Sequence, residues 1–307
     1  MLSTRKSASM LAFIVITGLV VVKALVAFLT GSISITAQAV DSFLDLFAVG
    51  VTMFAVRAAD EPADEQHPFG HGKIEGIAAA VQALLIFIAG GWIIYSAIER
   101  IVTGAELEMS EAGIAVMVVS IVASVLLSRH LLRVARASDS LALDATARNI
   151  NADIYSATGV LVTMVVIRFT GFSVLDPVVG VGVSLIILWS GYKVLKIACG
   201  ELVDNRLPEE EENVIVSCIE EHTTQLAGYH KVRTRKAGTQ RFVDFHLLLP
   251  KDMPLEEAHA MADHIEQDIK DRLAGTSVTI HLEPCEGDCD NCRISSCNLR
   301  SASDRPD

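Results

Sequence analysis

Long apolar runs separated by short polar segments make up the first two thirds of the chain. The six runs lie near residues 10–30, 33–56, 76–100, 112–134, 145–168 and 174–197. A helix of about 20 apolar residues spans the hydrocarbon core of a bilayer. The pattern therefore predicts a six-helix transmembrane bundle over residues 1–206, with the lipid bilayer as its surroundings.

Positive side chains are distributed unevenly between the polar segments. Most occupy one side of the predicted bundle, and Arg100 and Arg168 at the opposite ends are exceptions. The residues on the first side are Arg5, Lys6, Arg57, Lys73, Arg129, Arg133, Arg136, Arg148, Lys193 and Lys196. The opposite connections, near residues 31–32, 102–111 and 169–173, contain no Lys or Arg. Because Lys and Arg are retained on the cytoplasmic side of a membrane protein, we expect both termini of this multi-pass chain to be cytoplasmic.

The hydrophobic pattern changes at Leu207. Residues 207–284 alternate between helical periodicity and short β-type runs, in the order helix, strand, strand, helix, strand. This order predicts a small α+β (α-β-β-α-β) cytoplasmic domain with one sheet covered by helices. Residues 285–307 lack periodicity, and we expect a tail that is disordered without metal.

Composition narrows the class of function. The chain is 51% hydrophobic with a net charge of −12, and its acidic residues gather in the segments outside the apolar runs. This charge excludes nucleic acid as a partner and is compatible with cations. The sequence carries no nucleophile motif, so we do not expect an enzyme.

Two acidic residues lie inside the second apolar run. Asp41 and Asp45 are four residues apart, so they share one face of the helix. The fifth run contains Asn149 and Asp153 with the same spacing. A charge within the membrane is costly and usually functional, and four oxygen ligands suit a divalent metal. The alternative for these residues is hydrogen bonding between helices.

The connection between the second and third runs reads DEPADEQHPFGHGKIEG. Asp64, His67 and His71 are spaced so that a short turn could gather them around a metal ion. The alternative is an ordinary solvated polar loop.

Four cysteines crowd the C-terminal tail: Cys285, Cys289, Cys292 and Cys297. Disulfides are disfavoured in the cytoplasm, so these thiols are a candidate site for zinc or copper(I). An iron–sulfur cluster and a metal-free disordered tail remain alternatives. Cys199 and Cys218 stand alone, and we interpret them as packing residues.

These features together resemble the cation diffusion facilitator family, of the bacterial zinc and ferrous-iron efflux type. The resemblance rests on the Asp41/Asp45 pair, on Asp153, on the loop sequence HPFGHGKIE, and on the segments RTRKAG and IHLEP. It implies an inner-membrane homodimer with dimerised cytoplasmic domains. It also implies metal/proton antiport by alternating access, with protons as the counter-ion.

The resemblance also implies which residues bind metal. Zinc-transporting members carry His where this chain has Asn149, so the transported ion is expected to be Fe(II), Zn(II) or Mn(II), with oxygen ligands favouring the harder ions. In the cytoplasmic domain the family's paired regulatory metal site maps onto His230, His246, His259, His281 and Glu283. His222 and His264 have no counterpart there, and we interpret them as surface residues.

The expected function is therefore efflux of a divalent transition-metal cation, with the same metals acting as regulatory ligands. The alternative is a non-transporting, metal-sensing partner subunit of the same family.

Overall fold

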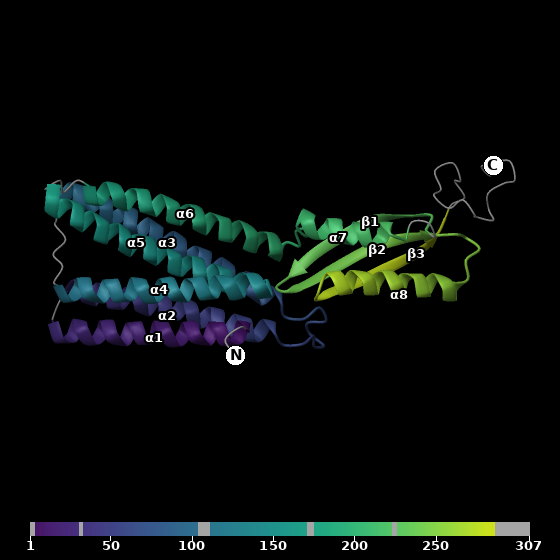
Figure 1. The fold of residues 1–307 in the computed structure, drawn as a ribbon, viewed down its shortest axis with the longest axis horizontal. Helices are drawn as coiled ribbons and strands as arrows, with labels where there is room; N and C mark the ends of the chain where they lie inside the picture. The colour runs from purple at the N-terminus through teal and green to yellow at the C-terminus, as the bar shows by residue number, and fades with distance from the viewer. Residues whose placement is uncertain (1–3, 31–32, 104–110, 171–174, 223–225, 286–307) are drawn as a thin grey trace. The chain divides into compact units, whose positions relative to one another are not determined.

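A computed structural model describes residues 4–30, 33–103, 111–170, 175–222 and 226–285. The chain divides into two compact units, Met1–Leu202 and Val203–Asp307 (Figure 1). The first unit contains helices and the second contains a three-stranded sheet with two helices. The predicted fold class, a helical bundle followed by an α-β-β-α-β domain, is confirmed.

Six helices lie side by side along the first unit (Figure 1). They are α1 (Arg5–Thr30), α2 (Ile33–Ala59), α3 (Lys73–Thr103), α4 (Glu111–Ser138), α5 (Leu141–Thr170) and α6 (Leu175–Leu202). In the part of the chain that the structure describes, all except α5 are long and apolar enough to cross a membrane. The helix α5 has 30 residues but carries Asp144, Arg148 and Asp153 in its first half.

Large apolar side chains cover the outside of the bundle. Phe28, Phe54, Trp92 and Trp189 are all exposed. In water such a surface would be unfavourable, whereas lipid chains solvate it without cost. The exposed apolar surface therefore marks the part of the bundle that contacts the bilayer.

The helices α3 and α6 approach each other closely at two glycines. A Cβ atom at Gly90 would lie 2.8 Å from Leu188 Cδ2, and one at Gly191 would lie 2.9 Å from Ile86 Cγ2. Because each glycine accepts a large side chain from the opposite helix, any larger residue would force Leu188 or Ile86 to shift. Small residues at helix contacts are typical of membrane bundles.

A buried ion network holds one end of the bundle together. The Glu75 carboxylate is fully buried and accepts hydrogen bonds from Arg5 Nη1 (2.6 Å) and Ser140 Oγ (2.5 Å). It also accepts one from the Ala142 N–H (3.3 Å), in the first turn of α5. Arg5 pairs with Asp60 as well, just beyond the end of α2. The end of α2 and the start of α5 therefore lie at the same end of the bundle, so these two helices are antiparallel.

The second unit contains α7 (Glu209–Glu220), β1 (Gly228–Ala237), β2 (Gln240–Leu249), α8 (Leu255–Arg272) and β3 (Thr276–Pro284). The strand order is β1-β2-β3. The strands β1 and β2 are antiparallel and joined by a turn at Gly238, with φ of 62°, whereas β2 and β3 are parallel. A parallel pair needs a crossover connection, and α8 supplies it.

One face of this sheet forms the core of the second unit. Along β2 the side chains of Val243, Phe245 and Leu247 are buried, and they pack with residues of α7 and α8 such as Ile219 and Ile265. Because side chains alternate along a strand, His246 lies on the opposite face. That face is left uncovered by the two helices, and it carries the histidines discussed below.

Candidate metal sites

A chain of buried hydrogen bonds fixes the register of α2 against α5. Thr52 Oγ1 lies 2.6 Å from Thr146 Oγ1, and both side chains are buried. Gln82 Nε2 of α3 donates to Thr52 Oγ1 (3.1 Å), and Thr146 Oγ1 donates to the Ala142 carbonyl (2.9 Å). The Thr52 hydroxyl must then donate to Thr146, so the bond has one direction.

The threonine pair places two of the predicted metal ligands at one depth. Asp45 lies seven residues before Thr52, and Asp153 lies seven residues after Thr146. Seven residues are about two helical turns, a rise of about 10 Å with nearly the same facing direction. Because α2 and α5 are antiparallel, both carboxylates lie the same distance from the threonine pair and on the faces that the pair brings together.

Asn149 lies on α5 between Thr146 and Asp153, about one turn beyond Thr146. It is buried, with 8% of its surface exposed. Asp45 and Asp153 are partly buried. Asp41 belongs to α2, but its side chain lies outside the described residues. The register thus places Asp45, Asn149 and Asp153 within two turns of the Thr52–Thr146 contact on α2 and α5, and their role as metal ligands stays a prediction.

Two further polar residues reach α2 close to this position, and the sequence analysis did not single them out. Lys23 Nζ of α1 donates to Ser42 Oγ (2.6 Å), between Asp41 and Asp45 in the sequence. Gln82 is fully buried and donates to the Ala48 carbonyl (2.7 Å), while its Oε1 has no hydrogen-bond partner among the described residues. Each is an isolated polar residue inside an apolar run, and that isolation is the signal that could have identified it.

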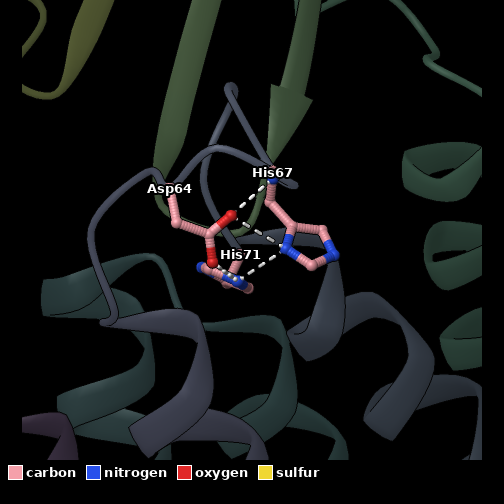
Figure 2. Close-up of side chains that lie close together, drawn as sticks. All are labelled: Asp64, His67 and His71. Carbon is pink, nitrogen blue, oxygen red and sulfur yellow. Dashed lines mark hydrogen bonds and ion pairs between the residues drawn. The ribbon is translucent and has the colours of Figure 1, made fainter.

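The loop before α3 gathers its three predicted ligands, as Figure 2 shows. His67 Nδ1 lies 3.2 Å from Asp64 Oδ1, His71 Nε2 lies 3.1 Å from His67 Nδ1, and His71 Nε2 lies 3.4 Å from Asp64 Oδ2. Metal–ligand bonds of about 2.0–2.1 Å in a tetrahedral site separate neighbouring ligand atoms by about 3.3 Å. The two imidazole nitrogens and one carboxylate oxygen of Asp64 are therefore spaced closely enough to occupy one triangular face of such a site.

Backbone hydrogen bonds hold this loop in shape. Asp64 Oδ1 accepts from the N–H groups of Gln66 (2.9 Å) and His67 (2.6 Å), and Gly70 with φ of 78° turns the chain toward His71. The His67 N–H is the main reason that the pKa of Asp64 lies below its usual range. The carboxylate is therefore charged and available to a cation at neutral pH.

A row of histidines crosses the uncovered face of the sheet. His230, His246 and His281 are directly opposite one another on β1, β2 and β3. Glu283, two residues beyond His281 on the same face, accepts hydrogen bonds from His246 Nδ1 (2.7 Å) and His230 Nε2 (2.8 Å). His281 Nε2 lies 3.6 Å from the same carboxylate. We call these four residues the sheet site.

Hydrogen bonding controls the charge of Glu283. The bond from His246, followed by the bond from His230, lowers the pKa of this carboxyl group. The ionised carboxylate thus lies between two imidazoles, and replacing their shared protons by a metal ion would keep all the ligand atoms close to their present positions.

Two other sets of predicted ligands remain, His259 and the tail cysteines. His259 is exposed on α8 beside Asp263 (3.5 Å), and α8 covers the opposite face of the sheet, so His259 does not join the sheet site within one chain. Of the tail cysteines only Cys285 lies within the described residues, where its N–H donates to the Leu249 carbonyl (2.8 Å). Cys289, Cys292 and Cys297 lie outside them.

His222 and His264, which the sequence analysis interpreted as surface residues, lie beside each other in the structure, where His264 is exposed and His222 is half-buried. The packing of α7 against α8 brings His222, His264 and Asp268 together, with one ligand atom from each within 4.8 Å of the others. His222 follows the end of α7, and the other two residues lie one turn apart on α8. The four-residue spacing of His264 and Asp268 could have indicated a pair of ligands on one helix face. The contribution of His222 could not be predicted in this way, because it depends on how α7 packs against α8.

Comparisons with known proteins divide the chain close to the boundary between the two structural units. A family model for the cation efflux transmembrane domain matches residues 9–203, and one for the cation efflux protein cytoplasmic domain matches residues 207–285. An uncharacterized transporter of Synechocystis sp. is 33% identical over 84% of this chain and 83% of its own length. The cation-efflux pump FieF of Cronobacter sakazakii is 32% identical over 91% of this chain and 92% of its own length. A solved structure of CzrB in its Zn form is 37% identical, with a TM-score of 0.26, and covers 28% of this chain and 96% of that one.

Proposed function

We propose that this chain, which belongs to the cation diffusion facilitator family of cation efflux transporters, exports a divalent transition-metal ion across the inner membrane in exchange for protons. The transported-metal site of this proposal consists of Asp41, Asp45, Asn149 and Asp153. The main support is the register of α2 and α5, because the Thr52–Thr146 hydrogen bond sets Asp45 and Asp153 at equal depth in the bundle.

The ligand types indicate the class of ion. Three carboxylates and one amide provide only oxygen atoms, which suit hard divalent cations, whereas zinc sites more often include imidazole or thiolate. Asn149 occupies the position on α5 that faces the same way as Asp153. We therefore propose Fe(II) or Mn(II) as preferred cargo, with Zn(II) also accepted.

Proton exchange follows from the chemistry of the same carboxylates. They must be ionised to bind the metal, and burial in a low-dielectric bundle disfavours their charged forms once the metal has left. Protons taken up on the outer side would neutralise the empty site and return with it to the cytoplasm. In this proposal the helices alternate between two arrangements, each opening the site to one side.

The proposed active form is a homodimer regulated by metal. The sheet site lies on the uncovered face of its sheet, and a second copy could complete the coordination of His230, His246, His281 and Glu283 there. His259 cannot reach this site within its own chain, and we propose that it contributes to the paired site at the dimer contact. Metal that bridges two copies would favour one dimer geometry over another. We also propose that the two termini, the second unit and the loop site, which consists of Asp64, His67 and His71, lie on the cytoplasmic side of the membrane.

Transport in reconstituted vesicles tests the proposal. Under a pH gradient, the wild-type protein should move Fe(II), Mn(II) or Zn(II), and the Asp153→Asn variant should not. Asp144→Asn is a matched control on the same helix, because Asp144 pairs with Arg148 (2.6 Å) near the helix start. Wild-type flux through Asp153→Asn would refute the site. Metal binding without flux in the wild-type protein would instead favour the metal-sensing partner subunit.

A further inference from the structure

We propose that His222, His264 and Asp268 form a separate divalent-metal site between the end of α7 and the middle of α8, which we call the α7–α8 site. None of the three residues belongs to the transported-metal site, the loop site or the sheet site. The α7–α8 site would clamp the two helices of the second unit together.

The three ligand atoms already converge. His222 Nε2 lies 3.6 Å from Asp268 Oδ2, and His264 Nε2 lies 4.0 Å from the same oxygen. The two imidazole rings meet edge to face, with their centroids 5.0 Å apart. A tetrahedral ion with bonds of about 2.0–2.1 Å needs ligand atoms about 3.3 Å apart. Small rotations of these side chains would therefore close the site without moving either helix.

Hydrogen bonding orients His222 for this role. Its Nδ1 donates to the Cys218 carbonyl (2.9 Å), one turn earlier in the chain. In the neutral ring, Nε2 then carries a lone pair that faces the Asp268 carboxylate oxygen. Two lone pairs facing each other repel unless a cation lies between them, and the cation is either a proton on Nε2 or a metal ion. A carbonyl that fixes the far nitrogen is the usual arrangement around metal-bound histidine.

The partial burial of the three ligands and the charges around them are also compatible with a bound metal ion. The side chains of His222 and Asp268 are 15% and 28% exposed, and that of His264 is 64% exposed. Two ligands are thus partly shielded from water and the third lies at an open entry. Arg272 hydrogen-bonds both carboxylate oxygens of Glu221 (2.7 and 2.5 Å) and also attracts Asp268 electrostatically, while His222 and His264 are the ring partners of Asp268.

The ligand set indicates the class of metal. Two imidazoles and one carboxylate bind Zn(II), Fe(II) and similar divalent transition metals. His264 and Asp268 are four residues apart on one helical face, the spacing by which a helix presents two ligands to one ion. The sheet site lies on the opposite face of the sheet from α8, so the two sites share no ligand and can be removed independently.

The experiment uses the full-length protein in detergent, stripped of metal and dialysed against buffered Zn(II). Elemental analysis should find one ion fewer per chain in His264→Ala and in Asp268→Asn than in the wild-type protein. Glu257→Gln, an exposed acid on the same helix that belongs to none of the proposed metal sites, is the control and should keep the wild-type zinc content. Equal zinc content in the wild-type protein and both variants would overturn the proposal and leave the cluster a proton-linked ion pair.

A second measurement does not depend on counting ions. With the four tail cysteines replaced by serine, His264→Cys should give a thiolate-to-Co(II) charge-transfer absorption on addition of Co(II). Glu257→Cys, exposed on the same helix, should give none. Adding Asp268→Ala to His264→Cys should weaken the absorption. Its absence in His264→Cys, or an equal band in Glu257→Cys, would overturn the proposal.

Discussion

The Thr52 and Thr146 hydroxyl oxygens lie 2.6 Å apart between α2 and α5, and neither side chain is exposed to solvent. Gln82 donates into this pair and the Ala142 carbonyl accepts from it, so three helices share one directed hydrogen-bond chain. Asp45 and Asp153, two of the acids that we propose for transport, lie two turns away on the same helix faces. The threonine pair therefore fixes the register of α2 and α5 at the proposed site without belonging to it.

Thr52→Val should destabilise the protein by about 1–3 kcal/mol, because it leaves the Gln82 N–H without its Thr52 acceptor and Thr146 without its donor. Thr52→Ser keeps the hydroxyl group and should be nearly neutral. Thermal unfolding in detergent measures both changes, with Thr17→Val as a control whose hydroxyl bonds only within its own helix, to the Phe13 carbonyl. Equal stability of Thr52→Val and wild type would show that the hydrogen bond is unimportant.

Glu75→Gln should destabilise the bundle by about 1–3 kcal/mol, because it weakens the partly buried pairing of Arg5, which keeps only Asp60 as its charged partner in this network. The same change removes a carboxylate that accepts the Ala142 N–H in the first turn of α5. Unfolding in detergent measures the loss. Glu65→Gln changes an exposed glutamate of the neighbouring loop and should have almost no effect, and a similar shift in both variants would argue against the network.

The sequence predicted the helices well, because a bilayer requires long apolar runs and leaves few alternatives. It also predicted the Asp41/Asp45 and Asn149/Asp153 pairs, since helical spacing alone places each pair on one face. The role of Glu75 was not predictable in this way. It ends the HPFGHGKIE sequence that indicated a metal loop, yet its partners Arg5 and Ser140 lie far away in the sequence and meet it only through helix packing.

In the second unit, too, the sequence pattern does not reveal which distant residues the packing brings together. Alternating apolar residues predicted β2 and its buried face, but the alignment of His230, His246 and His281 depends on strand register. A bulge between His230 and Arg233, with Lys231 at φ of 52°, contributes to that register. The pattern of apolar residues in β1 gives no sign of this irregularity. His222 joins α8 only because α7 packs beside it, which local spacing cannot reveal.

Glu283 should make the protein more stable at neutral pH than in acid. His246 and His230 lower its folded pKa below the unfolded value of about 4.3. Its contribution is therefore complete above the unfolded pKa and is lost as the pH falls through the folded pKa. The difference in unfolding temperature between wild type and Glu283→Gln, measured without metal, should be present at pH 7 and shrink toward pH 3. Glu256→Gln, exposed on α8, is the control, and a pH-independent difference would contradict the prediction.

Lys23→Met should tighten metal binding at the transport site. Lys23 donates to Ser42, between two of the proposed ligands, and its positive charge opposes a divalent cation there. We expect the apparent KM for metal to fall by about tenfold, which corresponds to about 1.4 kcal/mol. Lys23→Arg keeps the charge and should retain the wild-type KM. An unchanged KM in Lys23→Met would place Lys23 outside the electrostatic reach of the site.

Asn149→His should shift transport toward Zn(II), because imidazole is a better ligand for zinc than an amide oxygen. Asn149 is buried one turn beyond the Thr52–Thr146 pair, so a ring at this position would point into the same part of the bundle as Asp153. Competition among equal concentrations of Zn(II), Fe(II) and Mn(II), measured in vesicles under a pH gradient, should show a higher zinc fraction than in the wild-type protein. Asn151→His is the matched control, since Asn151 accepts from Ser128 of α4 (2.7 Å) on another face of the helix. An unchanged preference in Asn149→His would mean that this side chain does not contact the transported ion.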